Sequence, residues 1–173
     1  KTYISLMSHF STFVQELNSC NTEEDVKSVY ARHYNIKYDT ASHIDLYTPQ
    51  ILFEFKHDLN FENKKTVATI LAQILYYVHR LKYGLSSRII SPLLCLTDKN
   101  EAILTETLQW HIFYTDIDEN YDWDLPPSSP DAKLINDLLQ SPEFSKLQVF
   151  KIQNEHEYEF FSERITRYLQ SDL

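Results

Sequence analysis

Gly84 is the single glycine in this chain of 173 residues. Glycine is the residue that lets a backbone approach a phosphate closely, and the glycine-rich loops that bind nucleotides need two or three glycines at fixed offsets. One glycine cannot supply such a loop. P-loop enzymes and enzymes with a dinucleotide-binding fingerprint are therefore excluded.

The length and the apolar content favour one folded domain. Hydrophobic residues make up 43% of the chain and charged residues 24%, which is enough apolar material for a sizeable core. No linker-like stretch divides the sequence. We expect a single domain over residues 1–173, and because the chain begins at Lys1, this domain can be the N-terminal part of a larger polypeptide.

Cysteine use and hydropathy indicate a cytoplasmic location. Cys20 and Cys95 each lie in or beside an apolar segment, and two cysteines cannot build a disulfide framework or a zinc knuckle. No run approaches the roughly 18 apolar residues of a membrane span, and the N-terminus lacks a signal pattern. We expect a cytoplasmic protein with no membrane partner.

Hydrophobic periodicity predicts both helices and strands. Apolar residues recur at helical spacing over residues 3–17, and Thr22 before three acids marks the start of a second helix. A hairpin and then a long helix follow. The predicted strands are 43–47, 51–56, 88–97, 101–107, 110–114 and 147–152, and the later helices are 64–82, 131–139 and 158–169. This order predicts an α/β domain with a small mixed sheet flanked by helices.

The hairpin carries the most distinctive chemistry. In its second strand, alternation sends Ile51, Phe53 and Phe55 to one face and Glu54 and Lys56 to the other.

Two strands of one hairpin can aim the carboxylates of Asp45 and Glu54 at one point, as a divalent cation such as Mg²⁺ requires. Lys56 can orient or deprotonate an attacking water and balance the charge that develops on a phosphate.

These residues resemble a known superfamily. Asp45, then eight residues, then Glu54-Phe55-Lys56 on a hairpin is similar to the motif of PD-(D/E)xK nucleases, a fold shared by many restriction endonucleases. Gln73 and Tyr77, four residues apart in the next helix, resemble the QxxxY motif of RecB-type and restriction-subunit nucleases. The sequence departs from the family at the position before Asp45, where Ile44 replaces the proline. The likeness covers about residues 16–97.

The resemblance implies a restriction endonuclease-like core and a Mg²⁺-dependent DNA endonuclease, with Mn²⁺ able to substitute. It implies a nuclease domain of a restriction-modification or related DNA-processing system, which acts with a helicase, methyltransferase or specificity module in the same polypeptide or complex. The metal site it implies consists of Asp45, Glu54 and Phe55. The catalytic set it implies consists of Asp45, Glu54, Lys56, Gln73 and Tyr77.

The net charge of −9 argues against a general nucleic-acid coat, but the charge is unevenly distributed. Residues 56–88 hold six lysines and arginines against two acids, and Lys64, Lys65 and Arg80 are the candidates for phosphate contacts. Residues 98–124 hold eight acids and one lysine. Tyrosines that could stack on bases are Tyr76, Tyr83 and Tyr114.

Other interpretations of the same residues stay open. Glu54 and Lys56 are also compatible with a same-face surface ion pair, and Gln73 and Tyr77 with ordinary helix-surface positions. Glu16 is either an additional acid of the metal site or a solvated glutamate. The alternative function is a catalytically inactive nuclease-fold domain that binds a protein or DNA, using residues 98–124 to dock a basic partner. In a third interpretation the likeness of the hairpin to the nuclease motif is coincidental, and the chain is an unrelated α+β regulator.

Overall fold

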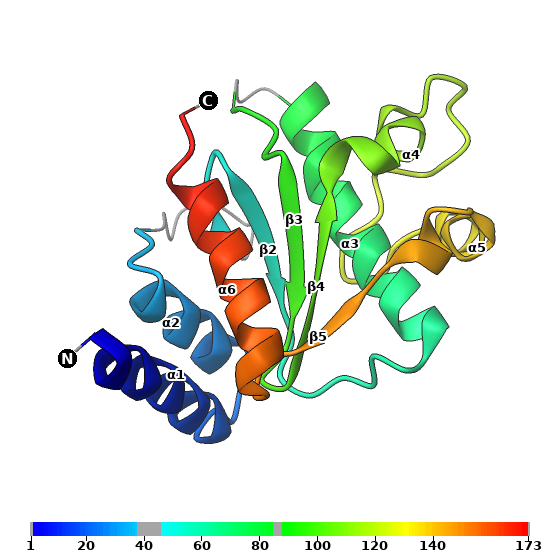
Figure 1. Cartoon of the computed structure of the whole chain (residues 1–173). Coiled ribbons are helices and arrows are strands. Elements are labelled where there is room, and N and C mark those ends of the chain that lie inside the picture. Colours follow the sequence, from blue (N-terminus) through cyan, green and yellow to red (C-terminus); the bar gives the residue numbers. More distant parts are fainter. Residues whose placement is uncertain (1, 38–45, 85–87, 173) are drawn as a thin grey trace.

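The protein is a mixed α/β structure in three layers, with helices on both faces of a central sheet (Figure 1). The computed structural model describes residues 2–37, 46–84 and 88–172, with side chains from residue 9 onward. One face of the sheet is covered by α1 (Thr2–Asn18), α2 (Glu23–His33) and α6 (Glu155–Leu169). The other face is covered by α3 (Lys64–Tyr83), α4 (His111–Thr115) and α5 (Ala132–Gln140). The predicted α/β class is confirmed.

The strands lie in the sheet in the same order as in the chain. They are β1 (Leu46–Tyr47), β2 (Ile51–Phe55), β3 (Leu93–Thr97), β4 (Glu101–Glu106) and β5 (Val149–Lys151). β2 and β3 are parallel, and α3 makes the crossover between them, whereas the other three pairs are antiparallel. The register places Phe53 opposite Leu46 on one side and Cys95 on the other.

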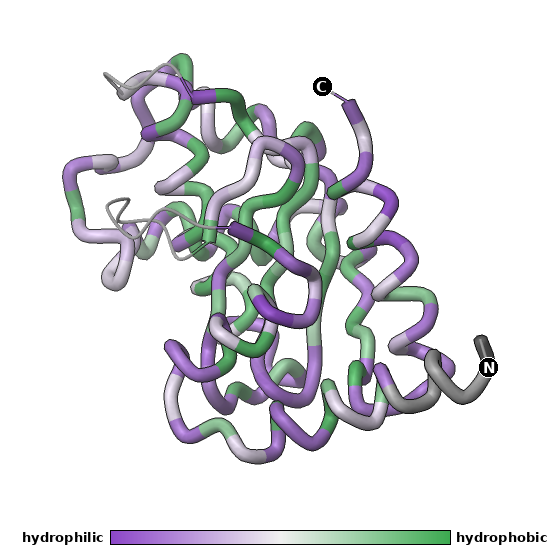
Figure 2. The backbone as a smooth tube through the Cα atoms, turned by 90° about the vertical axis from the view of Figure 1, so that its left-hand side faces the viewer, coloured by the Kyte–Doolittle hydropathy of each residue, from purple (hydrophilic) through white to green (hydrophobic). Residues whose placement is uncertain are grey.

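Alternation along β2 sorts its side chains between two cores. Ile51, Phe53 and Phe55 enter the cluster beneath α1, α2 and α6, whereas Leu52 enters the cluster beneath α3. Both faces of the central strands are therefore apolar, and the strands form a hydrophobic band between more polar helices (Figure 2). The period of two predicted for this strand is confirmed.

Local signals explain where the helices begin. At α2 the Oγ1 of Thr22 accepts a hydrogen bond from the Asp25 amide at 3.1 Å, and the Asp25 carboxylate accepts one from the Thr22 amide at 3.2 Å. This capping box satisfies backbone donors that the first helical turn leaves free. At α3 the side chain of Asn63 accepts from the Thr66 amide at 3.1 Å. The predicted helix 64–82 is confirmed to within one residue.

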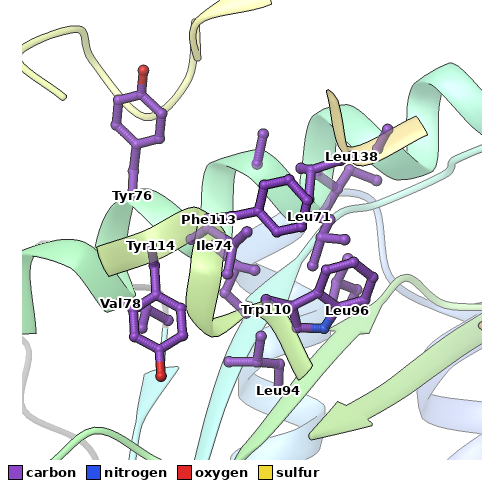
Figure 3. Packing of buried hydrophobic residues seen from close by; sticks show 14 of the residues in the cluster. Leu71, Ile74, Tyr76, Val78, Leu94, Leu96, Trp110, Phe113, Tyr114 and Leu138 are labelled. Atoms are coloured by element: carbon purple, nitrogen blue, oxygen red, sulfur yellow. The ribbon is translucent and has the colours of Figure 1, made fainter. Parts of the chain in front are cut away.

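The cluster on the α3 side shows how the crossover helix is held. Leu71, Ile74 and Val78 of α3 pack with Leu94 of β3 and with the fully buried Trp110 (Figure 3). Tyr76 points away from the sheet, and its hydroxyl donates to the carbonyl oxygen of Asp122 at 2.6 Å. The helix is therefore fixed on the sheet and also to the acidic loop that follows α4.

The predicted strand 110–114 is wrong. The chain instead forms a 3₁₀ helix, η1 (Thr107–Trp110), followed by α4, which ends at Thr115. The indole Nε1 of Trp110 donates to the Oγ1 of Thr105 at 3.0 Å, and this contact turns the chain back over the end of β4. Run length and aromatic content alone do not distinguish a strand from a short buried helix.

Smaller differences concern boundaries and exposure. β3 begins only at Leu93, after Pro92, and α6 begins at Glu155 because Asn154 caps it. A further short 3₁₀ helix, η2 (Phe144–Lys146), precedes β5.

Of the three tyrosines proposed to stack on bases, Tyr76 and Tyr114 are buried and Tyr83 is half exposed. Residues 43–45 of the predicted first strand lie outside the described part of the chain.

Among the described helices, none is long and apolar enough to cross a membrane.

Candidate functional site

Glu54 and Lys56 form an ion pair at the end of β2. The Glu54 side chain is nearly fully buried, on the face of the strand that α3 covers, where its neighbour Leu52 also packs. Lys56 comes directly after the last residue of β2, and its Nζ lies 3.4 Å from the Glu54 Oε1. The predicted same-face neighbours are thus in contact. A buried carboxylate beside an ammonium group is a charged pair held in place by the sheet.

A second carboxylate reaches this pair from another element. Glu23, in the first turn of α2, places its Oε1 3.8 Å from the Lys56 Nζ. The sequence indicated Glu23 only as a favourable charge at a helix start, and Glu16 as either an additional acid or a solvated glutamate. Glu16 pairs with Arg32 at 3.2 Å. Contact of α2 with the end of β2 is a long-range feature, so no local pattern revealed the role of Glu23.

The other metal-site candidates divide between described and undescribed positions. Asp45 lies outside the described residues. Leu46, the next residue, is opposite Phe53, the neighbour of Glu54. The Phe55 side chain has no oxygen and lies in the core on the face away from α3, so Phe55 could contribute to a metal site only through its backbone carbonyl. Within the described ranges alone, no group of three or more histidine, cysteine, aspartate or glutamate side chains is arranged to hold a metal ion.

Asp98 fixes the end of the sheet on which Lys56 lies. Its carboxylate is fully buried and accepts hydrogen bonds from the amides of Leu59 at 2.8 Å, Asn100 at 2.7 Å and Glu101 at 2.8 Å. Burial raises the pKa of Asp98, and the three amide donors oppose that rise. Asp98 thereby ties the turn between β3 and β4 to the loop that connects Lys56 to α3.

Gln73 and Tyr77 lie on the helix that covers the Glu54 face of β2. Both are half-buried, and Tyr77 packs against the α3-side core. The guanidinium of Arg80 lies 5.9 Å from the centre of the Tyr77 ring. The two residues are one helical turn apart, as predicted, and Arg80 extends the same side of the helix.

The predicted phosphate contacts do not form one patch. Lys64 and Lys65 are exposed in the first turn of α3, at the helix end that follows Lys56. Arg80 is in the last turn of the same helix. A rise of 1.5 Å per residue puts about 22 Å of helix between Lys65 and Arg80. The basic stretch therefore presents two separate cationic positions.

The acidic stretch 98–124 is less exposed than its composition suggests. Like Asp98, Asp116 is buried. Burial favours a higher pKa for Asp116, but hydrogen bonds from the amides of Asn120 at 2.8 Å and Tyr121 at 2.9 Å and from the Trp123 indole at 3.0 Å bring it below its usual value. These two acids organise turns and are not available to a docking partner.

Comparisons of the chain with known protein families, with curated proteins and with solved structures give no match.

Proposed function

We propose that the chain is a Mg²⁺-dependent deoxyribonuclease with a restriction endonuclease-like core, which hydrolyses DNA phosphodiester bonds. The observation that carries the proposal is the buried carboxylate of Glu54, held 3.4 Å from Lys56 at the end of a hairpin strand. Burying a charged pair costs desolvation free energy, and charged groups buried in this way are concentrated at functional sites.

The donor chemistry suits Mg²⁺, which prefers carboxylate and carbonyl oxygens. Glu54 would hold the ion together with Asp45 and the Phe55 carbonyl, with Glu23 as an additional acid. Bound there, the ion would lower the pKa of a water ligand and polarise the phosphate. Lys56 would orient the attacking water and balance charge on the phosphate oxygens. Gln73, Tyr77 and Arg80 would support the site from α3.

The expected substrate and partners follow from the same proposal. Lys64 and Lys65, exposed beyond the Lys56 end of the sheet, would contact the DNA backbone without reading its sequence. Because the chain carries a net charge of −9, much of the DNA affinity would come from a helicase, methyltransferase or specificity module that acts with it.

The test is cleavage of supercoiled plasmid and linear duplex by the purified chain in Mg²⁺, Mn²⁺ or EDTA. We expect metal-dependent nicking that Glu54→Gln and Lys56→Met each reduce by at least 100-fold. A double variant of an exposed ion pair, Lys133→Met with Asp137→Asn, removes the same two charges at a remote position and should cleave normally. Circular dichroism and thermal melting establish that all variants are folded.

Two outcomes would count against the proposal. Cleavage at the normal rate by Glu54→Gln would show that the activity does not come from this site. Absence of cleavage, together with a melting temperature that Mn²⁺ does not raise in a Glu54-dependent manner, would favour an inactive domain.

A second candidate function is a non-catalytic interaction domain. Three large apolar side chains are exposed on η1, on α4 and in the acidic loop that follows: Leu108, Ile112 and Ile117 are 75%, 73% and 84% exposed. Apolar groups beside acids such as Asp118 and Glu119 are typical of a protein-binding surface. This candidate predicts no metal-dependent stabilisation and no cleavage.

A further inference from the structure

A large cavity lies on the face of the sheet opposite to Glu54. It has a volume of about 1060 Å³ and is bounded by α1 and the end of α2 on one side and by α6 on the other. Figure 1 shows α6 crossing this face beside α1 and α2. We call this cavity the α6 groove. The sheet separates this groove from the side of β2 on which Glu54 lies.

The floor of the α6 groove is aromatic. The His33 ring is stacked between the rings of His9 and Phe13, with centroids 4.0 and 4.2 Å apart, and its Nε2 lies 2.7 Å from the Tyr158 hydroxyl. Tyr34 also lines the groove. Its buried hydroxyl has no well-formed hydrogen bond among the described residues, although the Ser162 side chain faces it. The floor therefore offers an apolar aromatic surface to an occupant.

The rim of the α6 groove is acidic. Glu155, Glu159 and Glu163 line it at intervals of four residues along α6, and all three are exposed. The single arginine among the lining residues, Arg167, lies 3.5 Å from Glu163 and neutralises only part of this charge. An interval of four residues places successive carboxylates about 6 Å apart along the helix axis.

We propose that the α6 groove binds a basic amphipathic helix of a partner polypeptide. The apolar side of such a helix would enter the aromatic floor. Its lysines or arginines, spaced by four residues, would face Glu155, Glu159 and Glu163 in the same repeat. The volume is at the top of the range of about 300–1,000 Å³ that is typical of small-ligand pockets, and the linear repeat of three carboxylates along α6 favours a polypeptide segment.

Charge disfavours two other occupants. A second copy of this chain carries a net charge of −9 and would be repelled by the rim, as would the phosphates of a nucleic acid. The inference does not depend on the nuclease proposal, because it uses none of the residues of the hairpin.

The test measures the binding of a fluorescein-labelled 18-residue helix of leucine and lysine, with leucine at i, i+3, i+4 and i+7, by fluorescence anisotropy. A scrambled peptide of the same composition and a peptide with glutamate in place of lysine are the peptide controls. Of the three peptides, we expect only the amphipathic basic peptide to bind. The triple variant Glu155→Gln, Glu159→Gln, Glu163→Gln should bind it about tenfold more weakly.

A matched variant distinguishes binding in the α6 groove from a general attraction of the basic peptide to the negatively charged protein. Glu24→Gln, Glu62→Gln and Asp118→Asn together remove three exposed charges elsewhere and should leave the affinity within twofold of the native value. Thr166→Trp, at an exposed position in the groove wall, should block binding without unfolding the protein.

Three results would overturn the proposal. The first is equal weakening by the two triple variants, and the second is equal binding of the scrambled peptide. The third is a different occupant, shown by a dimer in sedimentation that Thr166→Trp dissociates or by a labelled DNA oligonucleotide whose own binding to the protein Thr166→Trp abolishes.

Discussion

The ammonium group of Lys56 lies 3.4 Å from the Oε1 of Glu54, whose side chain is only 3% exposed, so the two charges are held together at the point where β2 ends. A carboxylate at that depth needs a positive partner. The native fold and the proposed chemistry therefore depend on the same contact, and stability measurements can examine it without any assay of activity.

Removing the Lys56 cation alone should destabilise the protein more than removing both charges of the pair. Lys56→Met leaves the buried Glu54 carboxylate without its cation and should lower the free energy of unfolding by about 3 kcal/mol. The double variant Glu54→Gln, Lys56→Met should recover at least half of that loss. Urea denaturation of the wild type, the two single variants and the double variant gives the coupling energy.

The exposed pair formed by Lys133 and Asp137 provides the comparison. Its side chains are 56% and 37% exposed, and Lys133→Met should change the free energy of unfolding by no more than about 0.5 kcal/mol. If Lys56→Met lowers the free energy of unfolding by no more than about 0.5 kcal/mol, the buried Glu54 carboxylate is not stabilised by Lys56.

Asp98 should be sensitive to substitution although it lies outside the hydrophobic core. Asp98→Asn replaces one acceptor oxygen by a donor that faces backbone amides, so at least one of three hydrogen bonds is lost. We expect a loss of about 2 kcal/mol in the free energy of unfolding. Asp118→Asn is the exposed control and should be close to neutral. Hydrogen exchange should show faster exchange of the Leu59 amide in Asp98→Asn, and an unchanged rate would contradict the assigned role.

His33 should make the stability depend on pH. Burial, followed by the charge of His9, lowers the pKa of His33 from 6.5 to about 3. Between these pH values the unfolded chain binds a proton that the folded chain excludes, so the free energy of unfolding rises with pH across this window. Because the ring keeps some contact with solvent, we expect a contribution of about 1 to 2 kcal/mol between pH 4.5 and 6.5.

His33→Gln should remove that part of the slope in urea denaturation at several pH values. Tyr158→Phe deletes the hydroxyl that contacts the ring and keeps the imidazole. It should lower stability by about 1 kcal/mol at every pH and retain the slope. A slope that persists in His33→Gln would assign the pH dependence to other groups.

Gly84 should tolerate no side chain. It ends α3 with a φ of −76°, which any residue can adopt, but a Cβ at this position would lie 2.4 Å from the carbonyl oxygen of Arg80. The backbone must shift to relieve that contact, so Gly84→Ala should lower the melting temperature by about 4 °C or more, equivalent to about 1 kcal/mol. Lys82→Ala, exposed in the same turn, should leave it within 2 °C.

Local patterns predicted those elements whose stability is decided locally. The apolar series of α3, the cap at Thr22 and the alternation of β2 are all determined by near neighbours in the chain. The segment after β4 was assigned wrongly: it forms η1 and α4, and Trp110 at the end of η1 donates a hydrogen bond back to Thr105 of β4. The pairing of Glu54 with Lys56 followed from strand alternation. The contributions of Glu23 and Asp98 depend on segments distant in sequence, which no local pattern reveals.

The agreement between sheet order and chain order affects how the protein folds. Each strand pairs with the strand that follows it, so every step from β1 to β4 closes a loop no longer than the α3 crossover, at a modest cost in chain entropy. The exception is α6, which is the last element made and packs against α1 and α2, the first. We expect pulse-labelled hydrogen exchange to find its amides among the last protected, so that a nascent chain has its sheet before it has a docking groove.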